Sequence, residues 1–296
     1  MRRGYCNICF IIKIIIDIFI DVIVTIFAIT SNLEMKRLIY SVVCTLLLIC
    51  SCENHNEWQP EYSIPEIMDL YILLGQSNME GEAPVEPQDL DPIKGVWILD
   101  TEGNIVPSDG IINRYSTIRF QGIPKYGLGA SFGRTMYESL GKDILLISNA
   151  RGGTNIAQWT KGSGFDYYEE AVRRARIALQ HEGVTLRGIL WHQGEGDSGL
   201  SKLEEYYYEK LTSIVSDFRE DFQAPQLPFI AGEIGYLFPN ANAFNSIIFR
   251  IEDYIPQSGY VSAEKCSLQG DNTHFTRSGY DLLGSRYAEK ALELCY

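Results

Sequence analysis

The chain of 296 residues is 46% hydrophobic and 21% charged, an ordinary globular composition that suffices for one large domain or two modest ones. Its 38 acidic and 25 basic residues give a formal net charge of −13. Phosphate-binding surfaces need clustered Lys and Arg, and the sequence has no such cluster, so the composition argues against a nucleic-acid partner. A neutral or weakly charged substrate fits better.

Residues 1–34 are predicted to lie outside the globular body. They contain the apolar run CFIIKIIIDIFIDVIVTIFAI, which is interrupted by the charges of Lys13, Asp17 and Asp21. Two interpretations remain open: a start codon assigned too early, with Met35 as the true start, or a genuine membrane anchor.

Residues 35–52 have the pattern of a secretory signal peptide, with a basic start at Lys36 and Arg37 and then a short apolar stretch. Their end resembles the bacterial lipobox, in which the last cysteine becomes the lipidated N-terminus of the mature protein. This resemblance implies a lipid on Cys52 and export to the periplasm or cell surface.

After a polar linker over residues 53–65, apolar runs suited to strands alternate with segments of helical period over residues 66–296. Five strands are predicted, at Leu70–Leu74, Ile144–Ser148, Leu186–Trp191, Pro228–Ala231 and Tyr260–Ser262. Helices are predicted between and after them, the last at about Arg277–Leu294. This alternation predicts right-handed crossovers and an α/β fold, a three-layer α/β/α sandwich around a five-stranded, mostly parallel, doubly wound sheet.

The region from Gln88 to Tyr126 breaks this alternation. Its stretch GVWILDTEGNIVP indicates two short strands around a Glu-Gly-Asn turn. We expect an insertion that walls the active site.

Four polar loops follow strands of the predicted sheet. They contain Gly75-Gln76-Ser77-Asn78, Asn149-Ala150-Arg151-Gly152-Gly153-Thr154, His192-Gln193-Gly194-Glu195 and Asp271-Asn272-Thr273-His274. Because ligands bind beyond the carboxyl ends of the strands in an open parallel sheet, all four loops are expected at one edge.

Ser77 is the candidate nucleophile of this edge. A serine hydroxyl needs an adjacent base that is itself oriented by a third group. His274 is the best base among the four histidines, and Asp271, three residues earlier, can accept from its outer ring nitrogen. Taken alone, Ser77 is better explained as a helix cap and Asp271 to His274 as an ordinary turn; the conjunction of four loops favours the catalytic interpretation.

The pattern around Ser77 differs from the nucleophile elbow of the α/β-hydrolases, because the second glycine of Gly-x-Ser-x-Gly is missing. Four blocks, GQSNMEG, ARGGTNIAQW, LWHQGEGD and DNTHFTRSGYDLLGSRYA, resemble instead the sialate O-acetylesterase-like group. These are the family-six carbohydrate esterases of the SGNH hydrolase superfamily, which has a flavodoxin-like fold. The resemblance extends from about Asp69 to Leu294.

The resemblance implies a serine esterase that removes O-acetyl groups from carbohydrate of the xylan or sialic-acid type, without a metal or other cofactor. It implies Ser77 as nucleophile, His274 as base and either Asp271 or Glu195 as the acid that supports it. The implied oxyanion donors are the backbone N–H groups of Ser77 and of Gly153 or Gly152, together with the Gln193 amide. The other polar loop residues are expected to bind substrate: Gln76, Asn78, Arg151 and Thr154.

Three alternatives are weighed against this function. His192, Glu195 and His274 are candidate zinc ligands, although Gly194 and the preceding strand give a poor geometry. A non-catalytic sugar-binding protein would use exposed aromatic rings, for which Trp97, Tyr126 and Trp159 are candidates. A lipase or thioesterase of the same superfamily would need a wide apolar groove, which the polar insertion does not indicate.

Only two of the seven cysteines, Cys266 and Cys295, lie in the predicted body. Cys266 follows the fifth strand, whereas the last helix carries Cys295 about 25 Å from that edge at 1.5 Å per residue. Bridged cysteines need Cα atoms within about 7 Å. Both thiols are therefore predicted to be free.

Overall fold

The longest buried apolar run forms the centre of the sheet. A computed structural model describes residues 62–119, 122 and 125–296, and it buries β1, Met68–Gly75, at every position. β1 pairs in parallel with β4, Asp143–Ala150, on one side and with β5, Val184–His192, on the other. The predicted leader, signal peptide, lipid site at Cys52 and most of the linker lie outside the described residues.

The sheet has seven strands in the order β3-β2-β4-β1-β5-β6-β7, so the prediction of five is wrong. The added strands are β2, Val96–Leu99, and β3, Ile105–Pro107, which come from the predicted insertion. β2 pairs in parallel with β4, and β3 closes that side as an antiparallel hairpin partner. The hairpin therefore extends the sheet, whereas Thr117 and Ile118 from the rest of the insertion line a cavity with Arg151. The other side ends in β6, Phe229–Gly232, and β7, Ser258–Val261.

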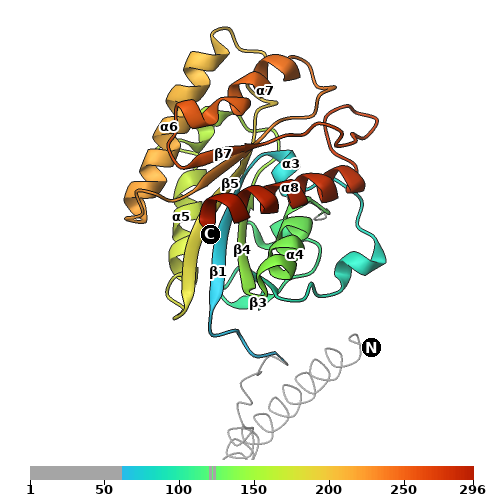
Figure 1. The fold of residues 1–296 in the computed structure, drawn as a ribbon, viewed down its shortest axis with the longest axis vertical. Helices are drawn as coiled ribbons and strands as arrows, with labels where there is room; N and C mark the ends of the chain where they lie inside the picture. Colours follow the sequence, from blue (N-terminus) through green and yellow to red (C-terminus); the bar gives the residue numbers. More distant parts are fainter. Residues whose placement is uncertain (1–61, 120–121, 123–124) are drawn as a thin grey trace, which may run out of the picture. The chain divides into compact units, whose positions relative to one another are not determined.

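Helices cover both faces of the sheet, which confirms the three-layer α/β/α prediction (Figure 1). One face packs against the amphipathic helices α5, Tyr167–Ala178, α6, Leu203–Asp221, and α7, Ala241–Phe249. The other packs against α4, Leu128–Leu140, and α8, Arg277–Cys295. Short pieces make up the rest: α3, Ser77–Glu80, and the 3₁₀ turns η1 to η4, Pro87–Leu90, Ile112–Tyr115, Ile156–Trp159 and Ile251–Asp253.

The strand register places three of the polar loops side by side. Gly75 at the end of β1 lies opposite Ala150 of β4 and His192 of β5. These three strands therefore end at the same level, and the chain leaves each of them at one edge. Only glycine fits at position 75, because its φ is 140° and a Cβ would lie 2.1 Å from the His192 carbonyl oxygen.

Cys266 and Cys295 are both free, as the sequence predicts. Burial raises the pKa of each thiol to about 11, so both are protonated and unreactive at neutral pH. Within the described part of the chain, none of the helices combines the length and apolar character needed to cross a membrane.

Candidate active site

Ser77 is the first residue of α3, directly beyond the carboxyl end of β1. The Gln76 N–H donates to the His192 carbonyl at 3.0 Å, and the Arg151 N–H donates to the Gly75 carbonyl at 3.0 Å. These bonds fasten the turn before Ser77 to the ends of β4 and β5. The serine is only 7% exposed, so these bonds hold a largely buried side chain at the edge of the sheet.

The structure brings Ser77, His274 and Asp271 together in a hydrogen-bonded chain. The Ser77 Oγ lies 3.0 Å from His274 Nε2, and His274 Nδ1 lies 2.6 Å from Asp271 Oδ2. When Nδ1–H donates to the carboxylate, Nε2 is left to accept the serine proton. This is the arrangement that a serine nucleophile, a general base and an orienting acid require.

Backbone hydrogen bonds keep Asp271 ionised. Its Oδ1 accepts the N–H groups of His274 at 3.0 Å and Thr273 at 2.9 Å. The bond from His274 contributes most, and together with the imidazole these contacts lower the pKa of Asp271 to about 2. The carboxylate is therefore available to His274 at every pH above about 3.

Asn78 clamps the nucleophile turn to the loop that carries His274. Its Nδ2 donates to the Thr273 carbonyl at 2.9 Å and to Glu195 Oε1 at 2.6 Å. Its Oδ1 accepts from the Phe275 N–H at 3.2 Å and the Tyr280 hydroxyl at 2.9 Å. Because Asn78 is fully buried and these contacts occupy its amide, the expectation that it binds substrate is wrong.

Among the described residues, Glu195 makes no hydrogen bond to His274. One carboxyl oxygen accepts from Asn78, and the other is buried without a hydrogen-bond partner among the described residues. Burial raises the pKa of Glu195. Of the two predicted acids, only Asp271 contacts the imidazole.

The glycine pair after β4 contains one engaged and one open N–H group. Gly152 donates to Glu80 Oε2 at 2.7 Å, which ties this loop to the last residue of α3. Gly153 has a φ of 74°, and a Cβ placed there would meet nothing within 4 Å. Among the described residues, neither the Gly153 nor the Ser77 N–H has a hydrogen-bond acceptor. These two groups are therefore the available oxyanion donors.

Gln193 is not an available donor, contrary to expectation. Its Nε2 lies 2.6 Å from Asp197 Oδ2, 3.1 Å from the Thr154 carbonyl and 3.3 Å from Gln76 Oε1. Its two N–H groups are thus engaged by protein acceptors, and the side chain is fully buried. Gln193 instead connects the loops after β1, β4 and β5.

Gln76 and Thr154 also serve the scaffold rather than the substrate. Gln76 Oε1 accepts from Gln193 and, at 3.4 Å each, from the Gly194 and Gly196 N–H groups. The Thr154 hydroxyl donates to the Arg151 carbonyl at 3.2 Å and accepts from the Trp159 indole at 3.0 Å. Both side chains are buried. The Gln76 carbonyl and the Thr154 hydroxyl therefore hold the loops in place and do not contact substrate.

Arg151 is the predicted substrate residue that stays partly exposed. Its guanidinium donates to the Ile118 carbonyl at 2.6 Å and lies 5.8 Å from the centre of the Tyr167 ring. It lines a cavity of about 470 Å³ with Phe165 and Glu170. Arg151, which lines this cavity, directly precedes the Gly152–Gly153 pair in the sequence.

The zinc and sugar-binding alternatives do not match the geometry. No group of three or more potential metal ligands occurs within the described ranges. His192 is buried, bonds to Tyr287 through Nδ1 at 3.1 Å, and has its pKa lowered by burial to about 3. Trp159 and Tyr126 are buried, and the half-buried Trp97 ring packs against Tyr62 with ring centroids 5.6 Å apart. Trp159 and Tyr126 therefore offer no open stacking surface.

Two acids that shape the site had no clear signal in the sequence. Glu80 holds Gly152, and Asp197 accepts from the Gln193 amide and the Ile156 N–H at 2.8 Å. Burial raises the pKa of both. Each lies within a few residues of a predicted site residue. This proximity is the only feature of the sequence that indicates a role for them in the site.

A family model described as "carbohydrate esterase, sialic acid-specific acetylesterase" matches residues 67–293. A probable carbohydrate esterase of Arabidopsis thaliana is 26% identical over 243 residues, which cover 75% of this chain and 90% of that protein. The family match includes all four polar loops and the strands that carry them.

Solved structures share the fold. The X-ray structure of the Arabidopsis protein aligns with a TM-score of 0.70 at 23% identity, over 79% of this chain and all of the other. NanS aligns with a TM-score of 0.62 at 15% identity, covering 78% and 98%. A carbohydrate acetylesterase from Xanthomonas citri aligns with a TM-score of 0.57 at 17% identity, covering 77% and 56%.

Proposed function

Because this chain belongs to the family of carbohydrate esterases described as sialic acid-specific acetylesterases, we propose that Ser77, His274 and Asp271 form the triad with which it removes O-acetyl groups from carbohydrate. The observation that carries the proposal is the hydrogen-bonded chain from Ser77 Oγ to His274 Nε2, 3.0 Å, and from His274 Nδ1 to Asp271 Oδ2, 2.6 Å. It joins a nucleophile, a base and an acid from two distant segments of the chain.

The reaction has two acyl-transfer steps. Ser77 Oγ attacks the acetyl carbonyl while its proton moves to His274 Nε2. The imidazolium then protonates the departing sugar oxygen, which leaves as a hydroxyl. Water attacks the acetyl-serine while His274 takes its proton, and the imidazolium returns a proton to the departing Ser77 Oγ, which releases acetate and restores the serine. General-base assistance of this kind contributes roughly 10²- to 10⁴-fold in rate.

The Ser77 and Gly153 N–H groups stabilise the oxyanion of each tetrahedral intermediate. A preorganised donor of this kind is worth about 3 kcal/mol. The Glu80 carboxylate positions this pair, because it holds Gly152 next to Gly153 and belongs to the same short helix as Ser77.

The acetylated glycan extends from the serine along the exposed edge of the sheet. Arg151 is the predicted substrate residue that borders a cavity, about 470 Å³ in volume. A guanidinium is chemically suited to sugar hydroxyl or carboxylate groups. Both xylan-type and sialic-acid-type glycans present such groups.

Replacing Ser77 or His274 with alanine tests the proposal. We expect kcat for p-nitrophenyl acetate, 9-O-acetyl-N-acetylneuraminic acid and acetylated xylotetraose to fall by at least roughly 10³-fold, because each change removes a reacting group. Released acetate and nitrophenol are the readouts. A p-nitrophenyl octanoate assay alongside measures the preference for acetyl over long acyl groups.

Matched controls are Ser213→Ala, on the outer surface of α6, and His181→Ala, in the turn that precedes β5. Both should keep wild-type turnover. Activity within a few-fold of wild type in Ser77→Ala or His274→Ala, with folding verified by circular dichroism, would exclude the triad.

A further inference from the structure

The loop between β6 and α7, residues 233–240, presents two neighbouring apolar side chains to solvent at the carboxyl edge of the sheet. We refer to it as the β6 loop. Tyr236 is 43% exposed and Leu237 is 67% exposed. An exposed apolar pair next to a polar site is typical of a ligand-contact surface.

A buried carboxylate fixes the Tyr236 ring. The Tyr236 hydroxyl donates to Glu233 Oε2 at 2.9 Å, and the same oxygen accepts from the Ser262 hydroxyl at 2.8 Å and the Ala263 N–H at 2.9 Å. Glu233 is only 4% exposed. The ring is therefore held by its polar end while much of its surface stays open to solvent.

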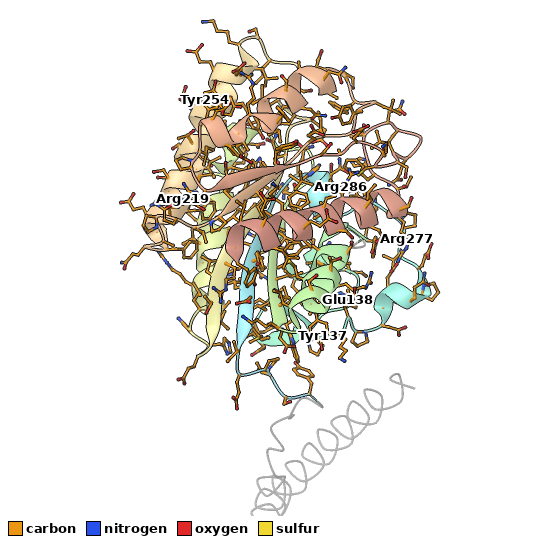
Figure 2. All side chains as sticks on the ribbon, viewed as in Figure 1. Tyr137, Glu138, Arg219, Tyr254, Arg277 and Arg286 are labelled. Atoms are coloured by element: carbon orange, nitrogen blue, oxygen red, sulfur yellow. The ribbon has the colours of Figure 1, made fainter. Side chains whose placement is uncertain are left out.

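The β6 loop lies between the two loops that carry Glu195 and His274. The Ser198 hydroxyl, three residues after Glu195, donates to the Pro239 carbonyl at 3.2 Å. On the other side, a Cβ at Gly235 would lie 2.7 Å from the Leu268 side chain, and Leu268 pairs with Phe275, the residue after His274. From α8, Arg286 donates to the Ser262 and Glu264 carbonyls at 2.7 Å each, which holds the start of the loop that carries His274 (Figure 2).

The sheet order sets the distance from this loop to the nucleophile. β6 is two strands from β1, because β5 lies between them. At the usual strand spacing, the ends of β6 and β1 are about 10 Å apart. A sugar whose acetyl ester is bound at Ser77 therefore reaches the β6 loop with its own ring or the next one.

We propose that Tyr236, with Leu237 beside it, is a stacking platform for a pyranose ring of the acetylated glycan, a role that rests on the proposed carbohydrate esterase function. Sugar rings present C–H faces that pack on aromatic rings, and a tyrosine offers an apolar face next to a polar end. The bond to Glu233 orders the ring before substrate arrives, so less entropy is lost on binding.

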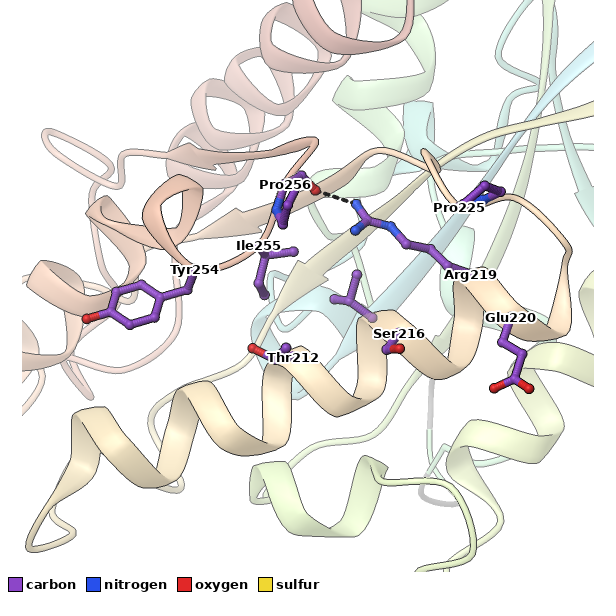
Figure 3. A pocket seen from close by; sticks show the side chains of 9 residues that line it. Thr212, Ser216, Arg219, Glu220, Pro225, Tyr254, Ile255 and Pro256 are labelled. Atoms are coloured by element: carbon purple, nitrogen blue, oxygen red, sulfur yellow. Dashed lines mark hydrogen bonds between the residues drawn. The ribbon is translucent and has the colours of Figure 1, made fainter.

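Tyr254 is a matched control for this platform. It is 45% exposed, and its hydroxyl donates to a glutamate, Glu204, at 3.2 Å. Tyr254 lies just before β7, on the opposite side of the view from Arg277, which follows His274 by three residues (Figure 2). It borders a separate cavity of about 440 Å³, where Arg219 donates to the Pro256 carbonyl at 2.6 Å (Figure 3).

The experiment measures kcat/KM for 9-O-acetyl-N-acetylneuraminic acid and acetylated xylotetraose, each divided by kcat/KM for p-nitrophenyl acetate in the same variant. We expect Tyr236→Ala to lower this ratio roughly threefold to tenfold for the sugar that wild type hydrolyses, through a higher KM, because one aromatic contact is lost. Leu237→Ala should lower it less. Tyr236→Phe keeps the ring but loses the bond to Glu233, so its ratio should fall between those of Tyr236→Ala and wild type. Tyr254→Ala should stay near wild type.

The outcomes separate this proposal from the proposed function. If wild type releases acetate from neither sugar, the carbohydrate esterase function fails and the platform fails with it. If wild type hydrolyses a sugar ester and the Tyr236→Ala ratio equals that of Tyr254→Ala, the platform is refuted while the esterase function stands. If Tyr236→Ala does not fold, the ratio for Leu237→Ala decides, and a wild-type value refutes the platform.

Discussion

At the scale of single residues, the two candidate acids differ in what they contact. Asp271 lies 2.6 Å from the His274 Nδ1 atom and has its pKa lowered to about 2, chiefly by the backbone N–H of His274. Glu195 bonds to Asn78 instead, and burial raises its pKa. An acid that orients an imidazole has to be ionised and in contact with it. Asp271 meets both conditions.

Replacing each acid with its amide tests this assignment. Asp271→Asn should lower kcat for p-nitrophenyl acetate by roughly 10³- to 10⁴-fold with KM little changed, because an amide holds the wrong imidazole tautomer. Glu195→Gln keeps an acceptor for Asn78 and should cost about tenfold or less. A larger loss in Glu195→Gln than in Asp271→Asn would reverse the roles.

At the scale of elements, the site depends on tight turns between strand ends. Gly75 ends β1 with a φ of 140°, and a Cβ there would overlap the backbone oxygen of His192 on β5. Gly153 also has a positive φ, 74°, but open space surrounds it. A side chain at position 153 would therefore meet backbone strain alone, whereas one at position 75 would also overlap a neighbouring strand.

Alanine at each glycine tests this distinction. Gly153→Ala should lower the free energy of unfolding by about 1 to 2 kcal/mol, the cost of a left-handed backbone for a residue with a Cβ. Gly75→Ala should cost clearly more than about 3 kcal/mol, because overlap with the β5 backbone adds to the strain. Urea denaturation gives both values. Equal losses would mean that β1 and β5 separate to admit the methyl group at little cost.

At the scale of the whole molecule, acidic groups set the response to pH. The formal net charge of −13 already favours expansion at neutral pH through repulsion. Burial also raises the pKa values of Glu80, Glu195 and Asp197 in the folded state. A carboxyl group with a raised folded pKa contributes most stability below its unfolded pKa, and this contribution is lost as pH rises toward the folded pKa.

The unfolding free energy should therefore fall as pH rises from about 4.5, the value for an unfolded glutamate. Glu195→Gln should flatten this decline and be more stable than wild type at pH 8, because its neutral amide loses no stability as pH rises. Asp271 has the opposite effect on the pH dependence. Its folded pKa is lowered, so its contribution to stability is present above about pH 4 and is lost as pH falls below that value. The unfolding free energies of wild type and Glu195→Gln are measured by urea denaturation from pH 5 to pH 8. An equal dependence on pH in the two proteins would contradict this account.

The sequence by itself determined the layers and the edge at which polar loops meet. Continuous apolar runs have to be buried on both faces, and parallel strands separated by helices have to end in the same direction. The spacing of these loops along the chain predicts that Ser77, His274 and Asp271 lie together. The sequence also predicts free thiols, because a helix fixes the distance between its ends.

Only the tertiary structure decided which polar side chains face the substrate and which hold the scaffold. Asn78, Gln193 and Gln76 follow strands just as Ser77 does, but their amide groups are engaged by partners far away in the sequence. The Thr154 hydroxyl is engaged by its near neighbours Arg151 and Trp159. The β2–β3 hairpin likewise joins the sheet by pairing with β4, which no local pattern of so short a segment specifies. Long-range pairing depends on the assembled fold, so local spacing cannot predict it.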